Sequence, residues 1–173
     1  MQQRNESEFL TAWDDRFDGT VVVAHRYAEY VEKASGGRIS FKFSGPEVIP
    51  GNQQFEPVSR GVFDLGFITP IYFLGTTGVP SAFFALPPDS ELWRAKGYWD
   101  FADQELQRFN QKLIAFVAGS GKNDFYQIVL REPLASGDMP LEGRKIRGNK
   151  YYQPIVVPTG GSLVNLPGGE MYS

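Results

Sequence analysis

The sequence predicts an α/β fold in which helices cover a mostly parallel sheet. Residues 38–43 alternate strictly, with Ile39, Phe41 and Phe43 on one face, as in a half-buried strand. Apolar residues between 20 and 34 recur at helical spacing. Extended and helical patterns follow one another along residues 8–69 in the order strand, helix, strand, helix, strand. This order is typical of a parallel sheet with covering helices.

The individual elements of this first part follow from local signals. The first strand is expected over residues 8–13, before the acidic turn DDRFDG. Thr20 is expected to cap the next helix, which ends at Gly36 and Gly37. A Pro/Gly-rich loop over 45–52, a short amphipathic helix over 55–62 and a buried strand over 64–69 complete the pattern.

The middle of the chain has a different texture. Residues 71–88 are rich in aromatic residues, glycine and proline without a clean period, which predicts an ordered aromatic loop. One long helix is expected from Leu92 to Phe109, then strands over 112–118 and 125–130, with a hinge at 119–121 between them. We therefore expect a first lobe over residues 1–121 and the start of a second over 122–173.

Composition excludes several classes of function. A chain of 173 residues with 42% hydrophobic and 14% aromatic residues is long and apolar enough for a packed core. A net charge of −3 gives no basic footprint, so nucleic acid is not an expected partner. The absence of cysteine excludes disulfides and thiolate metal sites. No apolar run reaches the roughly 20 residues that cross a bilayer. The start of the chain has no signal-peptide pattern. If the protein is exported, this sequence is therefore expected to be the mature form, after removal of a signal peptide.

The usual catalytic arrangements are poorly represented. His25 is the single histidine and lies within a predicted helix, where a structural role is expected. No serine lies in a G-x-S-x-G turn, and GSGKND lacks the phosphate-loop pattern. Asp14, Asp15 and Asp18 can be read as a cation site, but a solvated acidic turn is expected. The chain is therefore predicted to be a binding protein and not an enzyme.

The segment PLEGRKIRG at residues 140–148 holds the most informative cation. Along a strand, Ile146 points one way and Lys145 and Arg147 the other. Gly148 follows Arg147 and allows close approach to the backbone. A planar guanidinium in this place suits a carboxylate held by two parallel hydrogen bonds. A surface cation or a structural ion pair is the alternative for Arg147, whereas Arg144 is expected to be a solvated surface charge.

Four segments in order resemble the solute-binding proteins of TRAP (tripartite ATP-independent periplasmic) transporters. They cover most of residues 30–172 and read EYVEKASGGRISFKF, FEPVSRGVFDLGFITPIYFLG, LEGRKIRG and LVNLPGGEMY. The resemblance implies a two-lobed periplasmic-binding architecture that closes on a small organic acid and delivers it to membrane permease subunits. It also implies a periplasmic location, and a helix and further residues after Ser173, so the sequence is expected to be an N-terminal fragment. At residues 155–162 the chain departs from the family pattern, because Pro158 would break the helix expected there.

The resemblance also implies site residues. Arg147 matches the arginine that binds the substrate carboxylate, and Tyr72 matches a ligand-facing aromatic residue. Ligands of open α/β sheets bind beyond the carboxyl ends of the strands, which adds Trp13 with Asp14, and Thr69 at the start of residues 69–73. Asn149 is expected beside Arg147 on the second lobe.

Gln127 is a further candidate ligand-binding residue, because some members of the family hold a metal ion beside the carboxylate through a polar residue near this position. Here Phe125 and Tyr126 are alternatives for that position, so neither a metal nor any other cofactor is carried over. The aromatic loop favours a monocarboxylate with an apolar or aromatic tail, such as a 2-oxo or 2-hydroxy acid. The alternative function is a small cytosolic α/β enzyme or regulatory domain that binds a carboxylate.

Overall fold

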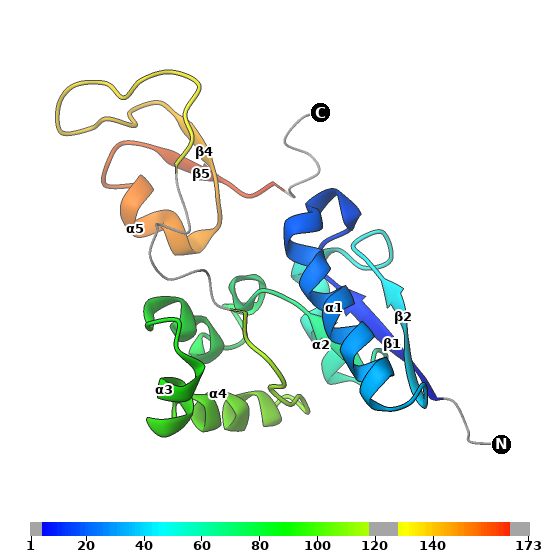
Figure 1. Ribbon diagram of the computed structural model, residues 1–173. Coiled ribbons are helices and arrows are strands. Elements are labelled where there is room, and N and C mark those ends of the chain that lie inside the picture. Colours follow the sequence, from blue (N-terminus) through cyan, green and yellow to red (C-terminus); the bar gives the residue numbers. More distant parts are fainter. Residues whose placement is uncertain (1–4, 118–127, 167–173) are drawn as a thin grey trace. The chain divides into compact units, whose positions relative to one another are not determined.

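The computed structural model describes residues 5–117 and 128–166. The chain divides into two compact units, residues 1–121 and residues 122–173, which are treated separately below (Figure 1). That these units correspond to the two lobes of a binding protein stays a prediction. No helix among the described residues combines the length and the apolar character needed to cross a membrane.

The first unit is built on a three-stranded parallel sheet in its described part. β1 (Asn5–Thr11) lies in the centre, between β2 (Ile39–Ser44) and β3 (Leu65–Phe67). Phe9 is in register with Phe43 on one side and with Leu65 on the other. The predicted parallel α/β pattern is therefore confirmed. The buried strand expected over 64–69 is wrong in extent and in burial, because β3 has three residues and its middle glycine is exposed.

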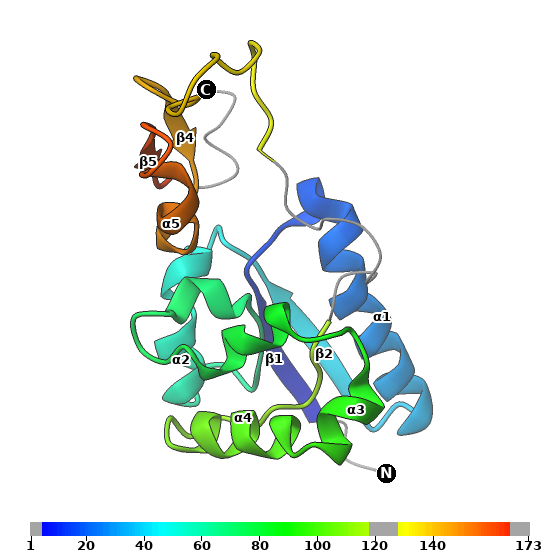
Figure 2. The same ribbon diagram turned by 90° about the vertical axis from the view of Figure 1, so that its left-hand side faces the viewer.

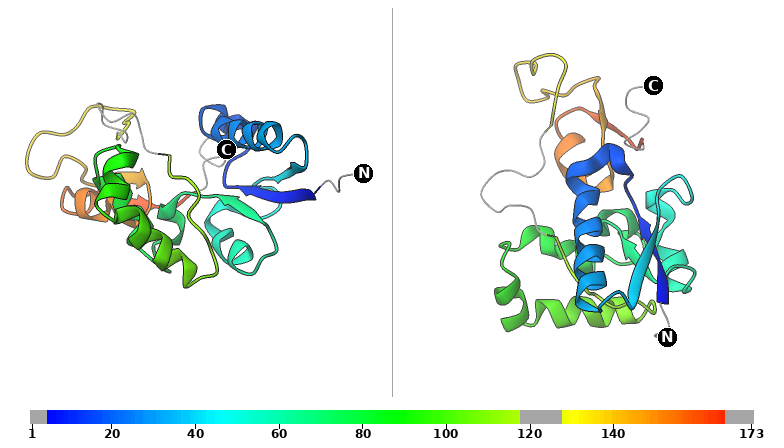
Figure 3. Two further views of the ribbon diagram at one scale, coloured as in Figure 1. Left: turned by 60° about the horizontal axis from the view of Figure 1, so that its bottom comes forward. Right: turned by 45° about the vertical axis from the view of Figure 1, so that its right-hand side comes forward.

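Helices α1 (Asp18–Ala34) and α2 (Phe55–Ser59) cover opposite faces of this sheet (Figure 3). The buried stripe of α1 consists of Val21, Ala24 and Ala28. The helix ends as predicted, at two glycines with φ values of 64° and 76°. The prediction that Thr20 caps α1 is wrong. A 3-10 helix, Asp15–Phe17, runs directly into α1, and Asp14 caps that turn instead.

Between the sheet and α1 lies a cluster of aromatic rings. The Phe9 ring stacks on Phe43 with centroids 4.9 Å apart and meets the edge of Tyr27 at 6.2 Å. The His25 ring lies 4.4 Å from the ring of Phe43, and its Nε2 is 3.6 Å from Oδ1 of Asp15. These contacts account for the histidine as part of the packing of α1 on the sheet.

The second half of this unit is helical. Residues 71–88, predicted as an aromatic loop, contain most of the 3-10 helix Pro70–Phe73 and the 3-10 helix Val79–Ala85. They lead to α3 (Ser90–Ala95) and α4 (Tyr98–Gln107), which meet at an angle (Figure 2). The single long helix expected from Leu92 to Phe109 is therefore wrong. Gly97 adopts a φ of 74°, a left-handed conformation that ends α3.

Aromatic residues hold the two helices to the 3-10 segment before them. Phe83, Trp93, Trp99 and Ala102 form one buried cluster. A second cluster joins Phe55, Phe73 and Leu106 and so links the sheet layer to α4. Large aromatic side chains supply most of the apolar area in both clusters.

Residues 112–117 do not form the strand predicted over 112–118. Asp103 of α4 fixes the start of this segment with side-chain hydrogen bonds. Its Oδ1 accepts from the backbone N–H of Leu113 at 2.8 Å, and its Oδ2 accepts from Gln107 at 2.8 Å and from Nζ of Lys112 at 2.5 Å. Burial raises the pKa of the Asp103 carboxyl, but these hydrogen bonds lower it by more, so the pKa lies below its ordinary value.

Two further predictions fall on this part of the chain. The hinge at 119–121 lies outside the described residues. So does the first half of the strand expected over 125–130, and residues 128–130 have irregular backbone.

The second unit is a small parallel pair of strands with a helical crossover. β4 (Lys145–Arg147) pairs with β5 (Ser162–Val164), and Arg147 lies opposite Val164. The connection holds the 3-10 helix Lys150–Tyr152 and α5 (Gln153–Val156), which ends before Pro158 as that residue predicts. Leu141 and Val156 are its buried apolar residues among those described. The helix expected after residue 167 lies outside the described residues.

Candidate functional site

The carboxyl edge of the first sheet brings together three of the predicted site residues. The connection from β1 to β2 contains α1, and the connection from β2 to β3 contains α2. These two helices cover opposite faces of the sheet, so in the strand order β2-β1-β3 the switch point lies between β1 and β3. Trp13 follows β1, and Thr69 and Tyr72 follow β3. The ring centroids of Trp13 and Tyr72 are 6.3 Å apart, with an angle of 33° between the rings. Both rings and Thr69 are half-buried.

Backbone hydrogen bonds fix this edge. The N–H of Ala12 donates to the carbonyl of Phe67 at 3.0 Å, and the N–H of Tyr72 donates to the carbonyl of Thr69 at 3.0 Å. The hydroxyl of Thr11 donates to the carbonyl of Trp13 at 2.7 Å. The two rings are therefore held by the ends of the strands and not by a free loop.

Gly51 allows the loop after β2 to lie against the same edge. A Cβ at this position would lie 3.0 Å from the carbonyl oxygen of Ala12 and 3.0 Å from Cε2 of Tyr72. Distances this short force a neighbour to move, and a backbone oxygen cannot move without moving β1. The sequence suggested a Pro/Gly loop here but gave no sign of this contact.

Gln54 ties that loop to the end of β1. Its side chain is fully buried. Nε2 donates to the carbonyl of Thr11 at 2.9 Å and to the carbonyl of Ile49 at 2.8 Å. Oε1 is buried and has no hydrogen-bond partner among the described residues. Sequence reasoning missed this residue, because one glutamine of a QQ pair carries no local signal for burial.

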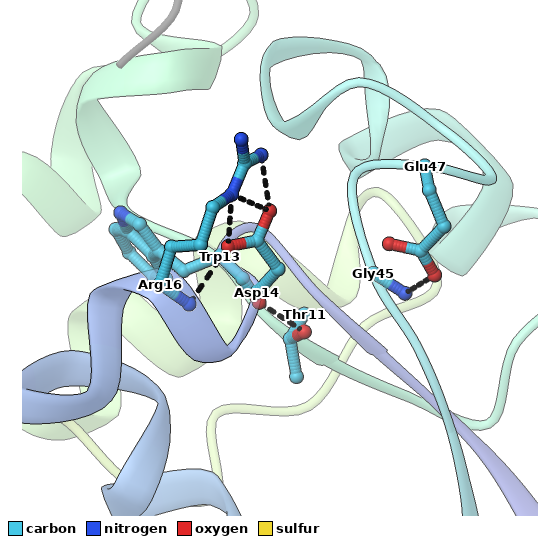
Figure 4. Close-up of polar contacts among 6 residues, drawn as sticks. All are labelled: Thr11, Trp13, Asp14, Arg16, Gly45 and Glu47. Carbon is cyan, nitrogen blue, oxygen red and sulfur yellow. Dashed lines mark hydrogen bonds and ion pairs between the residues drawn. The ribbon is translucent and has the colours of Figure 1, made fainter. Parts of the chain in front are cut away.

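Asp14 and Arg16 form an ion pair directly after Trp13 (Figure 4). Oδ1 of Asp14 accepts from the backbone N–H and from Nε of Arg16, both at 3.0 Å, and Oδ2 accepts from Nη2 at 2.6 Å. The side-chain hydrogen bond lowers the pKa of the Asp14 carboxyl and raises the pKa of the Arg16 guanidinium. The solvated acidic turn expected here is in part wrong, since Asp14 is bound by this arginine.

Glu47 is a second acid at this edge, in the loop after β2 (Figure 4). Its Oε1 accepts from the backbone N–H of Gly45 at 2.7 Å. Both acids drawn in the close-up are therefore engaged by donors of the chain itself.

In the second unit, Arg147 lies at the end of β4 and is exposed. Its Nε donates to the carbonyl of Leu166 at 3.0 Å. Nη1 and Nη2 have no partner within the described part of the chain, which also contains no carboxylate paired with Arg147. A Cβ at Gly148 would lie 3.1 Å from side-chain atoms of both Leu163 and Tyr152, so glycine is needed for the close packing after this arginine.

Arg144 differs from its expected role. Its guanidinium donates to the carbonyls of Glu132 at 2.9 Å and Pro133 at 2.5 Å. The prediction of a solvated surface charge is therefore wrong, because Arg144 anchors the loop before β4. Lys145 is exposed, as Arg147 is, and lies on the same face of β4 as Arg147.

Asn149 caps the 3-10 helix that follows β4. Its Oδ1 accepts from the N–H of Tyr151 at 2.9 Å. It also lines an open depression of about 440 Å³ together with Gln153, Leu163 and Asn165, a set to which Arg147 does not belong. Asn149 therefore has a structural role as a helix cap, and its role in ligand binding stays a prediction. Gln127, the remaining predicted residue, lies outside the described residues.

Within the described ranges, no three or more histidine, cysteine, aspartate or glutamate side chains gather as a metal site would require. Asp14 and Glu47 at the sheet edge accept hydrogen bonds from Arg16 and Gly45.

Comparison with known proteins identifies the fold. No protein-family model matches the chain, and no curated protein matches it. Solved structures do match. A TRAP transporter solute-binding protein from Bordetella bronchiseptica, with calcium and picolinate bound, aligns with a TM-score of 0.74 at 15% identity, over 98% of this chain and 52% of its own. A TRAP periplasmic solute-binding protein from Colwellia psychrerythraea, with calcium and pyruvate bound, aligns with a TM-score of 0.74 at 18% identity, over 98% and 53%.

The chain has the fold of the TRAP solute-binding proteins. A third example, from Desulfovibrio salexigens in complex with diglycerolphosphate, has a TM-score of 0.63 at 16% identity and is matched over 97% of this chain and 55% of its own. These neighbours are transport proteins and not enzymes. The chain spans about half the length of the TRAP proteins it matches.

Proposed function

We propose that the chain works as a periplasmic solute-binding protein of the TRAP type. In this role it captures a small organic acid and delivers it to the membrane permease of a TRAP transporter. The shared fold supports the type of protein. The acid as ligand, the permease as partner and the location are part of the proposal.

The observation that carries the proposal is the geometry of Arg147. The Nε bond to the carbonyl of Leu166 fixes the plane of the guanidinium, while Nη1 and Nη2 have no partner among the described residues. Two parallel donors at the end of a strand match the two oxygens of a carboxylate. An arginine held this way needs little further ordering when an anion binds, which favours affinity. Arg147 is therefore proposed to bind the carboxylate.

The first unit offers a different kind of surface. Trp13 and Tyr72 are half-buried and held by the ends of β1 and β3. Rigid aromatic rings at a strand edge suit the flat or apolar part of a ligand and lose little conformational entropy on binding. We propose that these rings and Thr69 are ligand-contacting residues of the first unit.

The ligands of the solved neighbours are compatible with this class of solute. Picolinate and pyruvate, bound by the Bordetella and Colwellia proteins, are small carboxylates. Those two proteins also hold calcium. The binding step proposed here rests on Arg147.

A thermal-shift screen tests the proposal. The purified chain is melted alone and with 2-oxo, 2-hydroxy and aromatic monocarboxylates, with dicarboxylates and sugar acids, and with uncharged amides of the same acids as controls. A ligand at 100 times its Kd adds about 2.7 kcal/mol of stability. We expect at least one carboxylate to raise the Tm and its amide to have no effect. Failure of every carboxylate in the screen would contradict the proposal.

A further inference from the structure

One face of the small sheet in the second unit carries only basic and uncharged side chains. Lys145 and Arg147 alternate with Ile146 along β4, so both point to the same face. In the register of the two strands, Lys145 lies opposite Ser162 and Arg147 lies opposite Val164. Three of these four residues are exposed, and Val164 is half-buried. We call the four residues Lys145, Arg147, Ser162 and Val164 the basic face.

The described part of the chain does not neutralise the two cations of the basic face. None of the ion pairs among the described residues includes Lys145 or Arg147. The chain as a whole has a net charge of −3, so an anion meets no general attraction to it. The basic face is therefore a local positive field on a protein that is acidic overall.

The two cations are suited to different steps of binding. Arg147 is anchored through Nε to the carbonyl of Leu166 and presents Nη1 and Nη2 as a fixed pair of donors. Lys145 ends in a strongly hydrated ammonium on a flexible stem, and ordering this stem around a ligand would cost side-chain entropy. Its charge still acts at a distance, because two residues along a strand are about 7 Å apart and the Debye length at physiological ionic strength is about 8 Å. Exposed charges beside a binding site typically change the rate of association.

From this arrangement we infer that Lys145 is a steering residue, which accelerates the capture of anionic solutes at the basic face while Arg147 holds the captured anion. The inference rests on the proposed function, because it assigns Lys145 to the capture step of that function. An uncharged solute of the same shape gains nothing from the field. Lys145 therefore favours acids over their amides at the moment of encounter.

The absence of cysteine from the chain allows a test that does not depend on which acid the protein binds. Val164→Cys places a single thiol on the basic face, in register with Arg147. The purified variant is alkylated with iodoacetate, which is a small carboxylate, and with iodoacetamide, which is the uncharged amide of the same acid. Both reagents react with the thiolate. The ratio of the two rate constants cancels the thiolate fraction and the access to the thiol, so it reports the attraction of the carboxylate.

We expect Lys145→Ala, added to Val164→Cys, to lower this ratio about twofold at about 0.01 M ionic strength, and Lys145→Glu to lower it about fourfold. These values follow from unit charges about 8 Å apart in water, the separation of two residues along one strand and one strand across, at a Debye length of about 30 Å. At about 1 M ionic strength the Debye length is about 3 Å, so the ratio should become nearly the same in all variants.

Lys150→Glu is the matched control. It makes the same change in net charge at an exposed lysine of the same unit, but Lys150 lines the depression beside α5, a set to which Arg147 does not belong. Its effect on the ratio should be clearly smaller than that of Lys145→Glu. If Val164→Cys folds poorly, Ser162→Cys carries the thiol instead, on the same face and in register with Lys145.

The outcomes are distinct. A fall of the ratio that is specific to Lys145 and disappears with salt supports the inference. An unchanged ratio in Lys145→Glu, an equal fall in Lys145→Glu and Lys150→Glu, or a fall that persists at about 1 M ionic strength overturns it, and the proposed function then still stands. Failure of every carboxylate in the thermal-shift screen contradicts the proposed function, and with it the capture step, whatever the alkylation rates are.

Discussion

The buried amide of Gln54 allows a test in which the more similar substitution is expected to be the more harmful. Nε2 donates to the carbonyls of Thr11 and Ile49, and Oε1 has no partner among the described residues. Gln54→Leu removes both polar atoms of the side chain, Nε2 and Oε1, at nearly constant volume. Gln54→Glu keeps the shape but turns the donor into an oxygen that faces two carbonyl oxygens.

The magnitudes follow from these contacts. In Gln54→Leu, the buried carbonyl of Thr11 and the part-buried carbonyl of Ile49 lose this donor at about 1–3 kcal/mol each, and loss of the unpaired Oε1 returns about the same amount once. The net cost is about 1–3 kcal/mol. Gln54→Glu loses the same bonds and adds a carboxylate in a fully buried position, so we expect at least about 3 kcal/mol. Against a total stability of about 5–15 kcal/mol, both are measurable.

Urea denaturation followed by far-ultraviolet circular dichroism provides the assay. Gln53 is the neighbour in sequence and is exposed, so Gln53→Leu and Gln53→Glu are matched controls and should change stability by about 0.5 kcal/mol or less. Equal costs for Gln54→Leu and Gln54→Glu would refute the reasoning, because they would mean that the side chain does not donate to the two carbonyls.

Two further predictions concern the packing of the first unit. Gly51→Ala should lower the free energy of unfolding by about 1–3 kcal/mol and shift the fluorescence of Trp13, because the added Cβ contacts Ala12 and Tyr72. The control Gly75→Ala should be near neutral, because a Cβ at that position meets nothing within 4 Å. Equal unfolding free energies for the two variants would contradict this prediction. Because the pKa of Asp103 is lowered in the folded protein, its stabilisation is present above the unfolded pKa of about 3.9 and is lost as pH falls through the folded value. Asp103→Asn should therefore lose less stability between neutral pH and acid than the unaltered chain in urea melts at a series of pH values, and parallel pH profiles would refute the assignment.

The parts of the fold that the sequence predicts well are those that depend on neighbouring residues. The alternation at 38–43 and the glycine pair after α1 locate β2 and the end of α1 to within a residue or so. Side-chain periodicity is a local property, so it can be recognised in the sequence without knowledge of the tertiary structure. The same is true of Arg147, whose place at the end of a short strand follows from KIRG.

The predictions were wrong where one residue, or a residue distant in the sequence, determines the local structure. A glycine inside a helical pattern is usually tolerated, but Gly97 takes a left-handed conformation and divides the helix. Residues 112–117 have a strand-like sequence, but the side chain of Asp103 binds the backbone there, and a strand requires a partner that no local pattern reveals. Thr20 has capping chemistry, yet the turn capped by Asp14 begins the helical stretch earlier.

In the candidate site, too, some residues could be predicted from the sequence and others could not. The rule that ligands bind beyond the carboxyl ends of strands places Trp13, Thr69 and Tyr72 at one edge, and the structure brings them together there. The supports of that edge, Gln54 and Gly51, act through contacts across 43 residues in one case and 39 in the other, which no periodicity reports. Their importance could be recognised only once β1 and the loop after β2 were adjacent.

The central claim is that Arg147 binds a carboxylate, and titration calorimetry of its variants tests this most directly. The ligand is the acid that gives the largest shift in the thermal screen, and the matched control is Lys145→Ala, which removes an exposed cation from the same face of β4. We expect Arg147→Ala to cost about 2–5 kcal/mol of binding, or roughly 30-fold to several-thousand-fold in Kd. Arg147→Lys should recover only part of this loss, because an ammonium lacks the planar fork. Lys145→Ala should cost less than about 1 kcal/mol. Equal, small losses for Arg147→Ala and Lys145→Ala would contradict the claim.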